Sequence, residues 1–288
     1  MKKIIERLLV FFIGIPLVSA LVLLLPHYCN LALNLAVIFF SGMGAAELSS
    51  MLEKKLIHIP KAESFILGAL TPLAITLNIS FGMPQWIIPV VIMTGAGWSL
   101  MSRVFSRKAE IEFITNYIIG CFSVLLYPGF FICWIVFMSG WGNPSAILLF
   151  LFITFGNDSI AWLFGTLFGA NNRGIITVSP NKSIAGFIGG IFGSILVAIA
   201  AVLVFSSHFP FHNDTPLSSM ILIAVIIGFC TGIAASLGDL AESAIKRSCD
   251  FKDSGNFMLG RGGVLDSIDS IAVAAPVFFL LFSNLFNV

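Results

Sequence analysis

Four polar residues in the segment SLGDLAESAIKR, residues 236–247, fall on one stripe of a possible helix. They are Asp239, Glu242, Ser243 and Lys246. Their spacing of i, i+3, i+4 and i+7 brings side chains to one helix face. Inside a membrane, such a stripe has to face a polar interior, because an acid at mid-bilayer costs roughly 2.5 to 3.5 kcal/mol. A helix end whose lysine reaches the membrane surface and pairs with Glu242 would give the same pattern, so this alternative stays open.

A second acidic stripe opens the last apolar run of the chain. Asp266, Asp269 and Ser270 follow one another at i, i+3 and i+4, directly after a glycine-rich loop. Acids in a first helical turn also favour the positive end of the helix dipole, which is the structural alternative. The two stripes nevertheless flank the same loop, which suggests that they act together.

The loop between the stripes, RSCDFKDSGNFMLGRGG, combines glycines with positive charge. Its basic residues, with the one just before it, are Lys246, Arg247, Lys252 and Arg261. Glycines let backbone N–H groups approach a phosphate, and lysine and arginine supply the counter-charge. Carboxylates facing such a loop could hold Mg²⁺ against a polyphosphate. No G-x-x-x-x-G-K-[ST] motif occurs, so the sequence does not support a P-loop NTPase.

A third polar element spans residues 155–190. Asp158 falls inside an apolar run, where an acid is expensive, and we therefore favour a functional role over a structural one. The polar segment that follows carries Arg173, Ser179 and Lys182. Glycines in the next apolar run, GFIGGIFGS, are expected to permit close packing of helices.

The elements that position these residues are predicted to be membrane-spanning helices. The 288 residues are 58% hydrophobic and 10% charged, with a mean hydropathy of +1.03. A soluble domain carries about 25% charged residues, so the composition indicates an all-α, polytopic integral membrane protein. At about 20 residues a crossing, we expect nine spans, over residues 8–25, 31–48, 63–80, 84–105, 112–139, 145–168, 183–206, 217–245 and 264–286.

Loop charge supports this count. With alternating loops, all 15 lysines and arginines fall on the side of the N-terminus. The positive-inside rule then predicts a cytoplasmic N-terminus, an external C-terminus and an odd number of spans. The first apolar run continues past Ala20, which favours a retained anchor over a cleaved signal peptide.

The chain shows no linker, so we predict one membrane domain over residues 1–288. Within it, residues 1–140 carry no specific motif and residues 141–288 carry the expected catalytic helices and loops. The span 112–139 contains Pro128 and Gly129, which should kink the helix or split it in two.

These residues resemble the signature of the phosphatidate cytidylyltransferases, or CDP-diacylglycerol synthases. That signature has the form S-x-x-K-R-x4-K-D-x-G, then a proline-glycine-histidine-glycine-glycine turn, then D-R-x-D. The matching residues are Ser243, Lys246, Arg247, Lys252, Asp253, Gly255, Gly260, Gly262, Gly263, Asp266 and Asp269. SPNKS with the upstream Asp158 resembles a second family block, whereas the first five spans match only in hydropathy and length.

The sequence departs from the family pattern at several positions. Leu259 stands for the proline of the turn, Arg261 for its histidine, and Ser267 for the arginine of D-R-x-D. In the second block, Ser183-Ile184-Ala185 stands where the family has threonine, tryptophan and glutamate. We hypothesise that Arg261 replaces the missing guanidinium, in which case Arg261→His would be strongly damaging and near-normal activity of that variant would count against the idea.

The resemblance implies transfer of a cytidylyl group from CTP to phosphatidic acid, giving CDP-diacylglycerol and pyrophosphate. It implies Mg²⁺, with room for a second cation, and Asp239 and Asp266 as metal ligands. Lys246 and Ser243 are the further expected catalytic residues. Expected substrate-binding residues are Arg247, Lys252, Arg261, Gly262, Gly263, Lys182, Ser179 and Asp158.

The expected partners are CTP, phosphatidic acid and the bilayer, with no nucleic acid and with a homodimer as one oligomeric state. The expected location is the bacterial inner (cytoplasmic) membrane with a cytoplasmic active site. One alternative is another CTP-dependent lipid enzyme, such as a CDP-archaeol synthase or a polyprenol kinase. The other is an ion-coupled transporter, which the one-sided placement of the acids disfavours.

Overall fold

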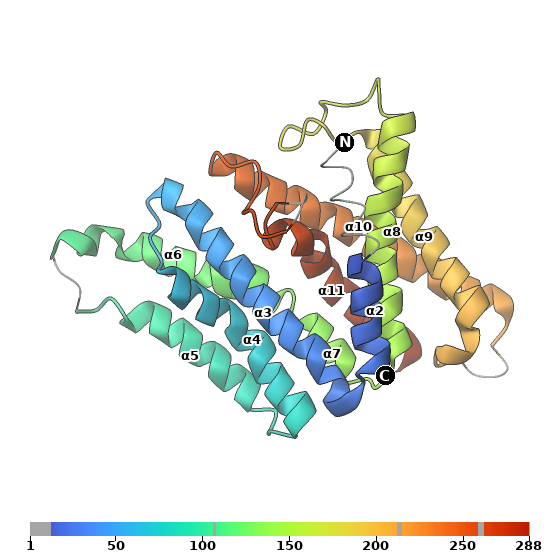
Figure 1. Cartoon of the computed structure of the whole chain (residues 1–288), viewed down its shortest axis with the longest axis horizontal. Coiled ribbons are helices and arrows are strands. Elements are labelled where there is room, and N and C mark those ends of the chain that lie inside the picture. Colours follow the sequence, from blue (N-terminus) through green and yellow to red (C-terminus); the bar gives the residue numbers. More distant parts are fainter. Residues whose placement is uncertain (1–12, 106–107, 212–214, 259–261, 288) are drawn as a thin grey trace. The chain divides into compact units, whose positions relative to one another are not determined.

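The computed structural model describes residues 13–105, 108–211, 215–258 and 262–287, with the backbone alone for residues 108–110. Within these ranges the protein is built from helices, without a β-strand (Figure 1). The α-helices are α2 (Ile15–Leu24), α3 (His27–Leu52), α4 (Lys61–Phe81), α5 (Ile87–Met101), α6 (Ile114–Val124), α7 (Trp134–Ser139), α8 (Pro144–Leu167), α9 (Ile184–Phe205), α10 (Leu217–Ser248) and α11 (Leu265–Phe286).

The protein is a multi-pass membrane protein. Seven helical segments of the described chain are long and apolar enough to cross a bilayer, which confirms the predicted class. Two of the nine predicted spans correspond to shorter helices, α2 with 10 residues and α5 with 15. At 1.5 Å per residue α5 is about 22 Å long, less than the roughly 30 Å of a hydrocarbon core, whereas only residues 13–25 of the first predicted span are described. The count of nine therefore stays a prediction.

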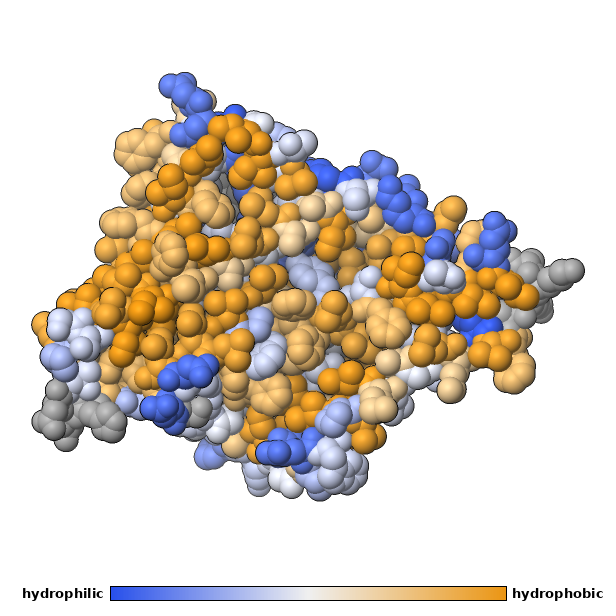
Figure 2. All heavy atoms as spheres, turned by 180° about the vertical axis from the view of Figure 1, so that it is seen from behind, coloured by the Kyte–Doolittle hydropathy of each residue, from blue (hydrophilic) through white to orange (hydrophobic). Residues whose placement is uncertain are grey.

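The surface of the protein is largely apolar. Figure 2 shows hydrophobic side chains over most of one face, with hydrophilic residues in smaller groups. Among the exposed apolar side chains are Leu24 at 73%, Met93 at 72% and Trp162 at 66% exposure. Water would penalise such a surface, whereas lipid chains cover it without cost.

The chain divides into two compact units, which we describe separately. Unit 1 comprises Met1–Gly140 and Ile245–Ile268, and unit 2 comprises Trp141–Ala244 and Asp269–Val288. The last turn of α10 and the first turn of α11 belong to unit 1, and the remainder of both helices belongs to unit 2.

In unit 1, α3 and α4 pack along each other (Figure 1). Ser41 Oγ of α3 lies 2.6 Å from the carbonyl oxygens of both Gly68 and Pro128, so one hydroxyl joins three segments. The predicted interruption near Pro128 is confirmed, because a π-helical segment, Leu125–Phe130, separates α6 from α7. Proline lacks an N–H group and its ring clashes with the preceding turn, which breaks the regular helix there.

In unit 2, α8 and α9 pack closely over glycines, as the sequence predicts (Figure 1). A Cβ atom at Gly193 would lie 2.7 Å from Ile160 Cβ, so only a bare backbone fits against α8. The buried Asn157 of α8 then joins three helices. Its Nδ2 donates to Ser194 Oγ of α9 at 3.1 Å and to a carbonyl of α10 at 3.0 Å, and its Oδ1 accepts from Ser236 of α10 at 3.1 Å.

Candidate active site

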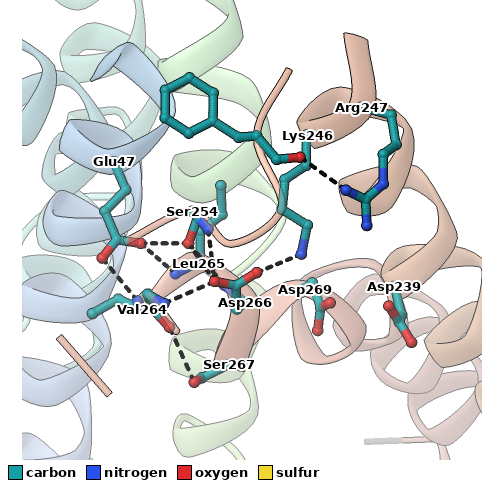
Figure 3. A network of polar contacts seen from close by, with 12 residues as sticks. Glu47, Asp239, Lys246, Arg247, Ser254, Val264, Leu265, Asp266, Ser267 and Asp269 are labelled. Carbon is teal, nitrogen blue, oxygen red and sulfur yellow. Dashed lines mark hydrogen bonds and ion pairs between the residues drawn. The ribbon is translucent and has the colours of Figure 1, made fainter. Parts of the chain in front are cut away.

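The centre of the polar site in unit 1 is an ion pair between Lys246 and Asp266 (Figure 3). Lys246 Nζ, in the last turn of α10, donates to Asp266 Oδ1, in the first turn of α11. A cation near a helix C-terminus and an anion near an N-terminus both complement the helix dipoles. The two side chains are only 10% and 7% exposed, so solvent screens this pair weakly.

The other oxygen of Asp266 is held by the loop between α10 and α11. Asp266 Oδ2 accepts from Ser254 N at 2.8 Å, Ser254 Oγ at 2.9 Å and Gly263 N at 2.7 Å. Sequence reasoning expects the glycine N–H groups to approach a phosphate. In the structure, the Gly263 N–H donates to Asp266 instead, and its contact with a phosphate stays a prediction.

Gly262 holds the loop in a conformation that favours glycine. Its φ angle is +107°, and a Cβ atom there would meet Asp266 Oδ2 at 2.5 Å. Its N–H donates to the Met258 carbonyl at 3.2 Å, and the Met258 N–H donates back to the Gly262 carbonyl at 2.8 Å. The two predicted glycines thus allow the backbone to wrap around the Asp266 carboxylate.

Glu47 of α3 completes this site, and sequence reasoning missed it. Its Oε1 accepts from Val264 N, and its Oε2 accepts from Leu265 N and from Ser254 Oγ, each at 2.9 Å (Figure 3). A signal was available, because Glu47 is an acid inside a predicted span, the criterion that singled out Asp158. Its partners lie more than 200 positions away in the chain, so the sequence could not show what it contacts.

The remaining basic residues of the loop do not join the ion pair between Lys246 and Asp266 in the described structure. Arg247 Nη1 donates to the Phe251 carbonyl at 3.2 Å, and Lys252 is exposed. Arg261 and Leu259 lie outside the described residues. The hypothesis that Arg261 replaces the missing guanidinium therefore stays a prediction. Ser267 Oγ donates to the Gly263 carbonyl at 3.3 Å, so the hydroxyl at the family's arginine position bonds to local backbone.

A second pair of predicted site residues meets in unit 2, where Lys182 Nζ forms a salt bridge with Asp239. Both side chains are about one-third exposed, at 32% and 34%. Ser179 belongs to the turn before this lysine, and its carbonyl accepts from Lys182 N at 3.0 Å. Ser183, where the family has threonine, caps α9 by accepting from Gly186 N at 3.0 Å.

Two of the acids predicted to face an interior are buried within unit 2. Glu242 is fully buried and Asp269 is 8% exposed, and Ser243 beside Glu242 on α10 is 6% exposed. Asp158 accepts from Ser270 Oγ of α11 at 3.5 Å, the limit of a hydrogen bond. Both predicted stripes thus lie on single helices, the first on α10 and the second at the start of α11.

Comparison with known proteins relates this geometry to a family. The pattern of the family described as "Cytidylyltransferase family" matches residues 5–285. The chain belongs to the cytidylyltransferase family. The match spans both units, so the Lys246–Asp266 and Lys182–Asp239 pairs both lie within the family domain.

Individual cytidylyltransferases align over much of the chain. A phosphatidate cytidylyltransferase of Staphylococcus haemolyticus is 31% identical over 238 residues, 82% of this chain and 84% of that protein. One of Thermotoga maritima is 31% identical over 224 residues, 76% and 77% of the two chains. The uncharacterized protein YnbB of Escherichia coli is 37% identical over 138 residues, and that alignment spans 48% of this chain and 42% of YnbB.

The described side chains of this cytidylyltransferase limit how it could ligate a metal ion. Among the described residues, no three histidine, cysteine, aspartate or glutamate side chains group in a way that could hold one. Mg²⁺, however, commonly takes only one or two carboxylates and keeps several water ligands. Asp266 Oδ1 fits that use, because its one described donor is a flexible lysine ammonium, whereas Oδ2 is held by three loop donors.

Proposed function

We propose that the protein transfers a cytidylyl group from CTP to phosphatidic acid at the site formed by α10, α11 and their connecting loop. The products are CDP-diacylglycerol, which enters phospholipid synthesis, and pyrophosphate. The enzyme is a nucleotidyltransferase of lipid metabolism. This agrees with its family and with two phosphatidate cytidylyltransferases whose alignments cover three quarters or more of both chains. The observation that carries the site is the contact between the motif residues Lys246 and Asp266.

The reaction joins two anions. An oxygen of the lipid phosphate attacks the α-phosphorus of CTP, a new P–O bond forms, and the bond to the β-phosphate oxygen breaks as pyrophosphate leaves. Positioning and neutralisation of charge therefore provide most of the catalysis. The ammonium of Lys246, whose side chain is only 10% exposed, supplies positive charge that water screens weakly.

Each predicted residue has a proposed role in this reaction. Lys246, Arg247 and Lys252 bind phosphate oxygens, and Ser243 donates a hydrogen bond to one of them. Asp239 and Asp266 are the proposed ligands of Mg²⁺, which when bound would neutralise phosphate charge. Each of these carboxylates forms an ion pair with a lysine ammonium in the structure, so each lies where a positive charge can approach it. The further proposed substrate-binding residues are Arg261, Gly262, Gly263, Lys182, Ser179 and Asp158.

The proposed site faces the cytoplasm of a bacterial cell, in the inner membrane. Positive charge supports this orientation, since the α10–α11 loop carries basic residues on the side predicted to be cytoplasmic. The N-terminus would then be cytoplasmic and the C-terminus external. Labelling of a cysteine introduced at Lys252 or at Ser207 in intact cells tests the orientation, and light scattering of the purified protein tests the predicted homodimer.

Product analysis tests the reaction. Purified protein is incubated with CTP, Mg²⁺ and one lipid acceptor at a time, and pyrophosphate and CDP are measured separately. A cytidylyltransferase releases pyrophosphate, whereas a polyprenol kinase releases CDP. We expect pyrophosphate with phosphatidic acid and none with polyprenol, and a large loss in Asp266→Asn. Equal turnover by that variant would contradict the assigned site, and CDP release would favour the kinase.

A further inference from the structure

We propose that Glu47 is a positioning residue of this site, which holds the start of α11 and the Ser254 hydroxyl so that Asp266 keeps its place. The inference rests on the proposed function for its catalytic consequence. It concerns a residue of α3, outside every motif that pointed to the site.

The first contact of Glu47 caps a helix from a distant part of the chain. The first N–H groups of an α-helix have no partner within the helix, and a nearby side chain usually accepts from them. At α11 that acceptor is Glu47, whose two oxygens each take one backbone N–H, from Val264 and from Leu265. The carboxylate therefore fixes where α11 begins, one residue before Asp266.

The second contact runs through Ser254. Its hydroxyl oxygen lies 2.9 Å from Glu47 Oε2 and 2.9 Å from Asp266 Oδ2. A hydroxyl carries one proton, so it donates to one carboxylate at a time while the other competes for it. The Asp266 N–H donates to the same Ser254 oxygen at 3.3 Å, which ties this hydroxyl to Asp266 by its lone pairs as well.

The glycines of the loop make room for this carboxylate. A Cβ atom at Gly255 would lie 2.6 Å from Glu47 Oε1, and one at Gly263 would collide with Glu47 Oε2. Two motif glycines thus face Glu47. Their bare backbone is needed so that the loop can close around the Glu47 carboxylate.

Substitution of Glu47 by glutamine separates this role from general stability. Glutamine keeps one acceptor oxygen and replaces the other with an amide that donates, so it faces at least one backbone N–H with another donor. The matched control is Glu63→Gln in α4 of the same unit. Glu63 likewise accepts two donors, Trp98 Nε1 at 2.5 Å and the Tyr117 hydroxyl, but lies in no part of the proposed site.

Two measurements are needed. Hydrogen exchange of the segment 253–266 needs no substrate, and we expect exchange about tenfold faster in Glu47→Gln than in the wild type or in Glu63→Gln. Steady-state kinetics, per folded protein, should show kcat lower by about 30-fold in Glu47→Gln with KM for CTP changed less than about threefold. Glu47→Asp, which restores the charge, should recover part of kcat.

Ser254→Ala tests the route to Asp266. If Glu47 acts through Ser254, the double variant Glu47→Gln/Ser254→Ala loses less than the product of the two single losses. Unchanged hydrogen exchange in Glu47→Gln would overturn the capping contact. Unchanged kcat, or fully multiplicative losses, would overturn the positioning role. A wild-type protein without turnover of CTP and phosphatidic acid would instead contradict the proposed function, while the exchange experiment would still test Glu47.

Discussion

Gly263→Ala is the substitution for which sequence and structure give different expectations. From the sequence, Gly263 lets the backbone approach a phosphate, so an added methyl group would weaken CTP binding. In the structure, a Cβ atom at Gly263 would collide with Ser254 Oγ and Glu47 Oε2 and would lie 2.6 Å from Gly255 N. The last of these is backbone and cannot rotate away. The loop itself must shift.

The expected loss of stability follows from the hydrogen bonds that the added methyl group would break. The Glu47 oxygen in the way accepts from Leu265 N and Ser254 Oγ, and hydrogen bonds to a charged group are worth about 1.5 to 3 kcal/mol each. Loss of one or two such bonds predicts a cost of about 3 kcal/mol. At roughly 2 °C per kcal/mol for a chain of this length, Tm should fall by about 6 °C. The same energy withdrawn from the transition state would lower kcat by about 100-fold.

The assay compares Gly263→Ala with Gly97→Ala in detergent. Gly97 lies in α5 of the same unit, and a Cβ atom added there would have nothing within 4 Å, so alanine should leave Tm unchanged or raise it slightly. Thermal unfolding, kcat and KM for CTP are measured for both variants. Wild-type Tm and kcat in Gly263→Ala, with KM for CTP raised more than about tenfold, would refute the steric reasoning and support direct phosphate contact.

Three further predictions concern unit 2. Lys182→Met should change Tm by less than about 2 °C, because its salt bridge with Asp239 is about one-third exposed and contributes at most about 1 kcal/mol. The kcat of this variant should nevertheless fall at least about tenfold, and a normal kcat would remove Lys182 from the site. Asn157→Leu should lower the free energy of unfolding by about 3 kcal/mol, since it removes two buried hydrogen bonds and one part-buried bond, and chemical unfolding that matches the wild type would show that these bonds are not made. Gly193→Leu should abolish folded protein on size-exclusion chromatography, because even a methyl group meets Ile160 at 2.7 Å; a monodisperse, active variant would contradict the close packing of α8 and α9.

Much of this architecture could be predicted because it depends on local patterns. Acids at i, i+3 and i+4 share a helix face wherever the helix is placed, so the stripes on α10 and at the start of α11 could be predicted before any packing was known. Pro128 interrupts its helix through its own covalent geometry, and the glycines of α9 indicate close packing through their lack of side chains. Helix length was less predictable, as α5 is shorter than its predicted span.

The sequence by itself determined the class of the protein, the positions of its intramembrane acids and the resemblance that led to its family. Hydropathy, helical period and motif spacing are properties of neighbouring residues, so they need no knowledge of the fold. Only the tertiary structure decided that Lys246 meets Asp266, that Lys182 meets Asp239, and that Glu47 holds the start of α11. Such contacts depend on which distant helices pack together, and that choice reflects the burial of whole helix faces, which no short segment records.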